Sequence, residues 1–234
     1  MNLYALAFGA HPDDVEMSCG GTLALLYRNG RQFGIVDFTK GEMGTRGNAE
    51  IRSREAKDAA KILGAEVRVN LGVSDSNIEL SRRNLLKVVE VMRKYRPEIV
   101  FAPYREERHP DHVHVHELVN DAMFYSGLRK LKTGNLAAYR PRRAFYYLQH
   151  RQFTPTVYVD ITHDFDTKVA AIKAHKSQFY NPDSKDPETS LSTPEFMEYL
   201  LGRMRYFGRM AGVRYAEPFW TYEPVTLTNF ESII

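Results

Sequence analysis

The sequence predicts an α/β fold, with a Rossmann-like, open, mostly parallel sheet covered by helices on both faces and a mixed α/β C-terminal part. Two observations support this prediction. Over roughly the first 130 residues, short apolar runs bounded by turn residues alternate with amphipathic runs of helical length. The chain has 234 residues, of which 43% are hydrophobic, so it can bury a substantial core. Strand–helix–strand alternation implies parallel strands, because each helix returns the chain to the same end of the sheet.

The elements of this first part follow one another in a regular order. Gly64 is expected to end a helix, and Ser81 is expected to cap the next one. The apolar stripe of the helix that ends at Gly64 consists of Ile51, Ala56, Ala60 and Leu63. The expected strands are 3–10, 32–40, 65–72 and 97–103, and the expected helices are 20–30, 49–64, 81–95 and about 113–130.

The second part of the chain is less regular. Its apolar runs predict strands at 142–150 and 156–162, and helices near 164–180 and 194–211. Residues 181–194 are polar and rich in proline, which predicts a mobile surface loop. No repeat or linker interrupts the chain. We therefore expect one domain over 1–234, with a Rossmann-like part at 1–130 and a C-terminal completion at 131–234.

Composition narrows the classes of partner. The chain carries 32 basic and 29 acidic side chains and has no long Lys/Arg block, which argues against nucleic-acid binding. No apolar run approaches about 18 residues, so no membrane-spanning helix is expected. The N-terminus reaches acidic residues too soon for a signal peptide. A lone cysteine, Cys19, rules out an intramolecular disulfide and is interpreted as a packing residue. These features predict a cytoplasmic protein.

Polar segments follow each of the first four expected strands. They read GAHPDD, TKGEMGTRG, GVSDSN and YREERHPDH. In open α/β sheets, ligands bind outside the carboxyl ends of the strands. We therefore expect these four segments to form one binding site.

Two of these segments contain a His-Pro-Asp motif, at His11–Asp14 and at His109–His112. Either motif alone could simply open a helix, since proline and aspartate favour the first helical turn. Together they bring three histidines and three carboxylates to one rim, a donor set that suits a divalent cation such as zinc. Spacing alone leaves open which residues bind the metal. A His112/His116 pair is one alternative, because residues four apart share a helix face.

The motifs AHPDD, GG-T, GE-GTRG, R---EA--AA-ILG and RHPDH together resemble the PIG-L/LmbE-like family of zinc-dependent N-acetylglucosaminide deacetylases. The similarity is greatest to the bacillithiol-biosynthesis branch, which deacetylates N-acetylglucosaminyl malate. The resemblance implies a Zn²⁺ cofactor, with Fe²⁺ or another divalent ion as alternatives, and a homo-oligomer, either a hexamer or a trimer. Phe196 stands where relatives of this branch can carry a tyrosine near the active site, so no C-terminal tyrosine is assigned.

The resemblance also implies a role for each residue of the two motifs and for two arginines. Metal binding falls to His11, Asp14 and His112, and the general base is Asp13. His109 stabilises or protonates the tetrahedral intermediate, and Asp111 is the acid that orients His109. The substrate contacts are Arg52 and, at the malate end, Arg108.

Two other hypotheses remain open at this point. The substrate could be a different N-acetylglucosamine (GlcNAc) conjugate, such as a chitooligosaccharide or a lipid-linked GlcNAc. A non-catalytic, metal-containing module that binds a sugar or nucleotide is the rival from another class. Asp13 argues against the binding module, because such a module has no need of a second acid beside the metal ligands.

Overall fold

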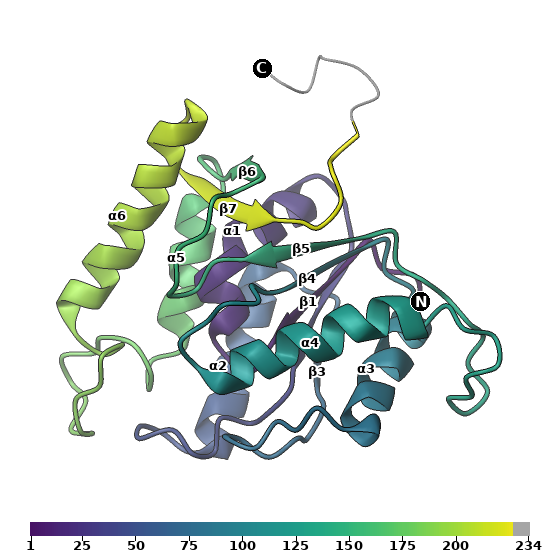
Figure 1. The fold of residues 1–234 in the computed structure, drawn as a ribbon. Helices are drawn as coiled ribbons and strands as arrows, with labels where there is room; N and C mark the ends of the chain where they lie inside the picture. Colours follow the sequence, from purple (N-terminus) through teal and green to yellow (C-terminus); the bar gives the residue numbers. More distant parts are fainter. Residues whose placement is uncertain (227–234) are drawn as a thin grey trace.

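The computed structural model describes residues 1–226, which form a seven-stranded sheet flanked by helices (Figure 1). The strands are β1 (Ala5–Gly9), β2 (Phe33–Asp37), β3 (Val67–Asn70), β4 (Ile99–Pro103), β5 (Arg143–Tyr147), β6 (Val157–Asp160) and β7 (Ala216–Trp220). The helices are α1 (Asp14–Arg28), α2 (Ala49–Leu63), α3 (Arg82–Tyr95), α4 (Pro110–Tyr125), α5 (Phe165–Ala174) and α6 (Pro194–Ala211). Among these residues, no helix is long and apolar enough to cross a membrane.

The sheet has the order β3-β2-β1-β4-β5-β7-β6, and its first five strands are parallel. This confirms the predicted α/β class. Strand β7 was not predicted. It lies antiparallel between β5 and β6, and its sequence, AEPFW, contains a charge and a proline, which do not mark a buried strand.

Helices cover both faces of the sheet (Figure 1). Strand β1 shows how the two layers are filled, because its side chains alternate between two buried clusters. Leu6 and Phe8 pack with α3 and α4, whereas Ala5 and Ala7 pack with α1, α2 and α5. Cys19 is fully buried in the second cluster, as expected of a packing residue. The predicted ends also hold, since Ser81 caps α3 and Gly64 ends α2 in the left-handed conformation.

Two helices begin earlier than the sequence predicted, and both begin inside a His-Pro-Asp motif. Helix α1 starts at Asp14 rather than near residue 20, and α4 starts at Pro110 rather than near residue 113. In α4, the proline takes the first-turn position, where its missing N–H is no loss. The consequence for function is that metal-binding residue types stand in the first turn of each helix.

Helix α1 is kinked at Cys19, whose backbone departs from helical geometry (φ −126°, ψ 15°). Past the kink, the N–H groups of Gly21 and Thr22 donate to the Glu217 carboxylate at 2.9 and 2.7 Å. Lys168 of α5 pairs with the same carboxylate. A Cβ at Gly21 would lie 2.7 Å from Ile161, so this glycine serves close packing. Strand β7 thus fixes the helix that carries the first motif.

Candidate metal-dependent active site

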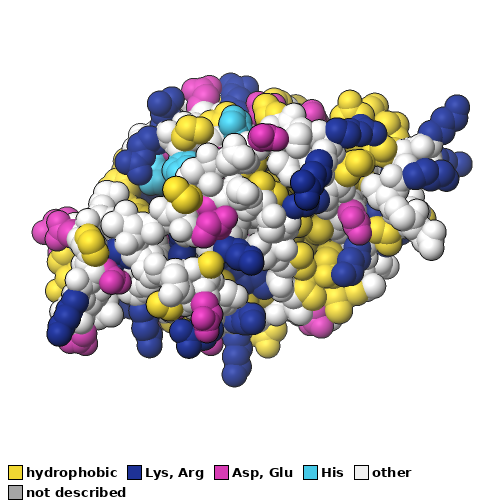
Figure 2. Space-filling view, turned by 90° about the horizontal axis from the view of Figure 1, so that it is seen from below, with side chains coloured by type: hydrophobic (Ala, Val, Ile, Leu, Met, Phe, Trp, Pro, Cys, Tyr) yellow, Lys and Arg dark blue, Asp and Glu magenta, His cyan; other side chains and the backbone are white. Residues whose placement is uncertain are grey.

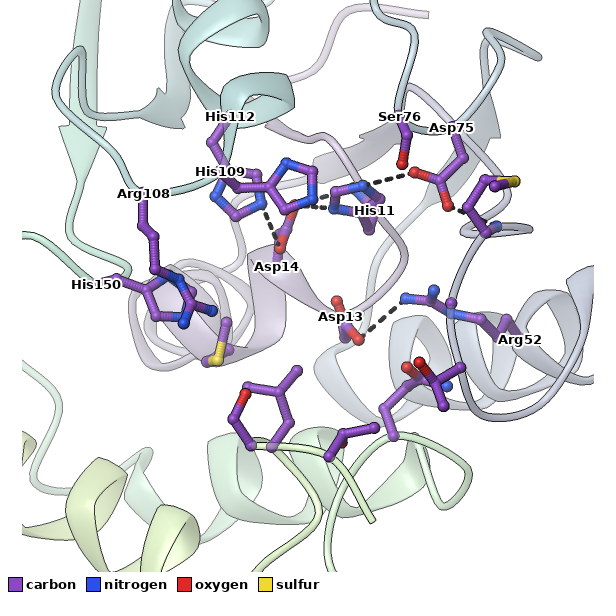
Figure 3. Close-up of a pocket in the computed structure, with 18 residues that line it drawn as sticks. His11, Asp13, Asp14, Arg52, Asp75, Ser76, Arg108, His109, His112 and His150 are labelled. Carbon is purple, nitrogen blue, oxygen red and sulfur yellow. Dashed lines mark hydrogen bonds and ion pairs between the residues drawn. The ribbon is translucent and has the colours of Figure 1, made fainter. Parts of the chain in front are cut away.

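A cavity of about 230 Å³ opens at the carboxyl ends of the parallel strands (Figure 3). Its walls come from the segments after β1, β2, β3 and β4, as the sequence predicted, and from C-terminal loops. On the face seen in Figure 2, histidine side chains reach the surface among charged groups. Of the eight predicted site residues, Asp111 alone is not part of the described lining. The seven that line the cavity are His11, Asp13, Asp14, Arg52, Arg108, His109 and His112.

Within residues 1–226, three groups of side chains could hold a metal ion, and one of them consists of His11, Asp14 and His112. His112 Nε2 lies 3.4 Å from Asp14 Oδ1, and His11 Nδ1 lies 3.6 Å from Asp14 Oδ2. Two atoms that each bind zinc at 2.0–2.1 Å with tetrahedral angles are about 3.3 Å apart. Each histidine nitrogen therefore lies at about the spacing of two zinc ligands from one oxygen of Asp14, Oδ1 for His112 and Oδ2 for His11.

The His112 ring gives an independent test of that fit. It is buried, yet within residues 1–226 neither of its ring nitrogens has a hydrogen-bond partner. A buried polar atom without a partner is costly, and a bound cation would satisfy it. His116 is committed elsewhere, because its ring contacts Pro103 O at 2.9 Å and Tyr222 Oη at 3.2 Å. These contacts do not favour the alternative His112/His116 pair.

Two residues of this group, Asp14 and His11, are held by residues to which sequence analysis assigns no role. Gln149 Nε2 donates to Asp14 Oδ1 at 2.8 Å, and His11 Nε2 contacts Asp75 Oδ1 at 3.0 Å. Burial alone would raise the pKa of Asp14, but His112 and His11 hold it well below its usual value. Burial likewise opposes protonation of His11, yet the carboxylates of Asp111, Asp14 and Asp75 keep its pKa well above the ordinary value. The carboxylates around His11 thus favour a positive charge beside them.

Asp13 is buried next to this group and points to the other side (Figure 3). Its carboxylate accepts a hydrogen bond from Arg52 Nη2 at 3.1 Å. Burial raises the pKa of Asp13, and the Arg52 guanidinium opposes that rise. Arg52 was expected to bind substrate, but it also donates to the carbonyl oxygens of Gly41 and Pro12. All of these contacts lie within the protein.

His109 caps helix α4, because its Nδ1 accepts a hydrogen bond from the Asp111 backbone N–H at 3.2 Å. The Asp111 carboxylate instead accepts from the Ser76 N–H at 2.8 Å and lies 3.6 Å from His11 Nε2. Asp111 thus contacts His109 through its backbone, whereas its carboxylate faces the metal-ligand side. Burial lowers the pKa of His109, and the neighbouring His11 and His112 lower it further.

The C-terminal part supplies a wall that sequence analysis did not identify. It consists of His150, Gln178 and residues 189–191. His150 lies three residues after β5 and ends the strand expected at 142–150, so the rule about carboxyl ends could have indicated it. Phe196 stacks on Phe179 and is not among the residues that line the cavity, so it occupies a packing position. Arg108 is exposed at the cavity wall.

Comparison with known proteins agrees with this geometry. A family model described as PIG-L: GlcNAc-PI de-N-acetylase matches residues 6–123. Diacetylchitobiose deacetylase of Thermococcus kodakarensis is 32% identical over 227 residues, covering 91% of this chain and 80% of the relative. The probable N-acetyl-alpha-D-glucosaminyl L-malate deacetylase 2 of Bacillus cereus is 27% identical over 191 residues, covering 76% and 84%. The bacillithiol branch is therefore only modestly supported.

Solved structures extend the similarity over nearly the whole chain. The conserved protein TT1542 from Thermus thermophilus superposes with a TM-score of 0.88 at 37% identity, covering 98% of this chain and 99% of the other. N,N'-diacetylchitobiose deacetylase from Pyrococcus horikoshii has a TM-score of 0.80 at 28% identity, covering 98% and 88%. The matched motifs, the shared fold and the His/Asp/His group lead to one conclusion: the chain belongs to the PIG-L family of deacetylases.

Proposed function

We propose that this chain is a zinc-dependent N-deacetylase that releases acetate from an N-acetylglucosamine conjugate. The observation that carries the proposal is the juxtaposition of the His11/Asp14/His112 group with a second carboxylate, Asp13, that points elsewhere. A site that only bound a metal would not need this additional acid. Two histidines and one carboxylate suit zinc, and three protein ligands leave a coordination position for chemistry.

The reaction needs a nucleophile, a proton acceptor and stabilisation of the developing oxyanion. A zinc ion held by the three ligands would polarise the acetyl carbonyl and lower the pKa of a bound water toward about 7. Asp13 takes the proton as the water oxygen attacks the carbonyl carbon. When the C–N bond breaks, the same proton passes from Asp13 to the departing amine. The products are acetate and a free amino sugar.

His109 suits the role of hydrogen-bond donor to the oxyanion. Its Nδ1 accepts the Asp111 N–H, so in the neutral ring the proton is on Nε2, which is free to face the substrate. The lowered pKa of His109 favours this neutral form. A neutral imidazole is a weak acid, which is why we assign the return of the proton to Asp13 rather than to His109.

The arginines favour a neutral substrate. Malate carries two carboxylates, and the cavity is lined by two arginines, Arg52 and Arg108. Arg52 is engaged with Asp13 and two backbone carbonyls, so of the two arginines in the described lining only Arg108 is exposed to a ligand. The similarity to diacetylchitobiose deacetylase supports the same choice. We therefore propose a neutral GlcNAc oligosaccharide first and N-acetylglucosaminyl malate second.

A substrate panel tests this function. Acetate release is measured from diacetylchitobiose, free N-acetylglucosamine and N-acetylglucosaminyl malate, with zinc removed by a chelator and then restored. We expect zinc-dependent release, fastest from diacetylchitobiose. Arg108→Ala should leave the neutral substrates nearly unchanged and raise KM for the malate conjugate. Tight sugar binding without acetate release from any substrate would instead favour a binding module.

A further inference from the structure

We infer that Arg52 is a positioning residue that holds the Asp13 carboxylate. This inference deepens the proposed function and rests on it, since it assumes that Asp13 is the general base. The resemblance to the family implies a different role for Arg52, a substrate contact. The two roles predict different kinetics, so they can be separated by experiment.

The surroundings of the guanidinium support the positioning role. Arg52 is only 4% exposed. Its Nη1 donates to Gly41 O at 2.9 Å, and its Nη2 donates to both Pro12 O at 3.0 Å and Asp13 Oδ2 at 3.1 Å. These contacts join the loop after β2 to the loop after β1. A buried arginine fork that is shared in this way is fixed in place before any substrate arrives.

The glycines of the GE-GTRG motif make room for this fork. A Cβ on Gly41 would lie 2.0 Å from Arg52 Nη1, and a Cβ on Gly44 would lie 3.0 Å from the same atom. Gly41 also has a positive φ of 67°, which other residues rarely adopt. The motif therefore forms a slot through which the arginine passes beneath the first His-Pro-Asp motif.

The backbone at Asp13 explains why such a clamp is needed. Asp13 has a φ of 134°, a conformation that is strained for any residue with a side chain. Strain of this kind persists only where surrounding contacts over-determine it. Arg52 Nη2 supplies two such contacts, one to the carbonyl of Pro12 and one to the carboxylate of Asp13.

The strained turn has a direct consequence for the chemistry. It directs Asp13 away from its neighbour Asp14, whose carboxylate belongs to the metal-ligand group. Arg52 is not drawn to Glu55 on its own helix, because Glu55 accepts hydrogen bonds from Ser177 N and Oγ. Arg52 therefore keeps the base distinct from the ligands.

A kinetic double-mutant cycle tests the inference on the zinc-loaded protein. Arg52→Lys keeps the charge but removes the fork, so we expect kcat to fall by about 10–100-fold while KM changes by less than about twofold. In an Asp13→Asn background, the same substitution should cost little more, because Arg52 acts through Asp13. Arg54→Lys, an exposed arginine on the same helix, is the matched control and should keep wild-type kinetics. A large rise in KM with kcat maintained, or fully additive losses, would overturn the inference.

A stability cycle keeps the test independent of turnover. Asp13→Asn and Arg52→Lys should each lower Tm by several degrees, roughly the effect of weakening a buried pair in a domain of this size. The double variant should lose no more than the worse single variant. Additive Tm losses would refute the Asp13–Arg52 coupling. If the wild type releases no acetate from any substrate, the proposed function fails, whereas this cycle still decides whether the two side chains are coupled.

Discussion

The two His-Pro-Asp motifs share three letters but enter their helices differently. In the second motif, the histidine is the N-cap, and the helix begins at the next residue, Pro110. In the first motif, the N-cap is the third residue, Asp13, and the helix begins at Asp14. The helix therefore begins two motif positions later than in the second motif. The strained φ of 134° at Asp13 accompanies this later start. The same letters therefore produce a plain helix start at one site and a sharp turn at the other.

Because the helices begin at different motif positions, His109 and Asp13 make different contacts. His109 uses Nδ1 to cap a helix, which leaves Nε2 free, whereas Asp13 makes no side-chain cap hydrogen bond in the described structure. The Asp13 carboxylate is instead held by Arg52. In both motifs the fourth letter, Asp14 or His112, belongs to the metal-ligand group. A helix start thus fixes one candidate ligand in each motif, and the first three residues of the two motifs make different contacts.

The largest effect is expected from loss of a candidate metal ligand supplied by either motif. His11→Ala, Asp14→Ala and His112→Ala should each lower zinc affinity by more than about 100-fold, because a three-ligand site has none to spare. Acetate release should fall below detection. Metal analysis after dialysis measures the loss. His116→Ala is the control, since His116 contacts Pro103 and Tyr222 and should keep the zinc. Full zinc occupancy in His112→Ala would show that His112 of the second motif is not a zinc ligand.

The next effect concerns the residue that distinguishes the first motif. Asp13→Asn preserves the size of the side chain and removes its ability to accept a proton. Loss of a general base commonly costs about 10²–10⁴-fold in rate, or roughly 3–5 kcal/mol of barrier. We expect that loss in kcat with zinc content unchanged. Substantial turnover by the zinc-loaded variant at neutral pH would exclude Asp13 as the base and would make the strained turn purely structural.

A pair of variants separates the two uses of His109. His109→Ala removes the helix cap and the Nε2 donor, whereas His109→Ser restores a good cap without that donor. Loss of an oxyanion donor costs about 10²–10³-fold in kcat, so both variants should be slow. His109→Ala alone should also lose about 1 kcal/mol of unfolding free energy, measured by urea denaturation. Recovery of activity in the serine variant would mean that capping is the main role of His109.

Much of the fold could be predicted because the first half follows a simple pattern. Apolar strands alternate with amphipathic helices there, and Gly64 and Ser81 mark helix boundaries through local chemistry. Strand β7 could not be predicted, because its buried charge, Glu217, is satisfied by the backbone of the kinked helix α1. That helix lies almost 200 residues away in sequence. The same reasoning applies to the site. The motifs indicated its residue types and its edge of the sheet, whereas the orientation of Arg52 depends on tertiary contacts with distant loops.

The smallest effect concerns a difference between the two ligand histidines. His11 Nε2 is held by Asp75 at 3.0 Å, which leaves Nδ1 for the metal, but neither His112 ring nitrogen has a hydrogen-bond partner within residues 1–226. Partial burial would raise the pKa of Asp75, yet the hydrogen bond from His11 lowers it to about 2, so the carboxylate is ionised at neutral pH. Asp75 Oδ2 also accepts the Met43 N–H at 2.9 Å.

Asp75→Asn should therefore weaken zinc binding by about 10–100-fold, as is usual when the partner of a metal-binding histidine is lost. The amide has one acceptor oxygen and cannot serve both His11 and Met43 as the carboxylate does. Competition with a chelator of known affinity measures the change. Activity at saturating zinc should recover most of the way, unlike that of the ligand variants. If zinc affinity stays unchanged, the metal alone orients His11, and the two ligand histidines are held in the same way.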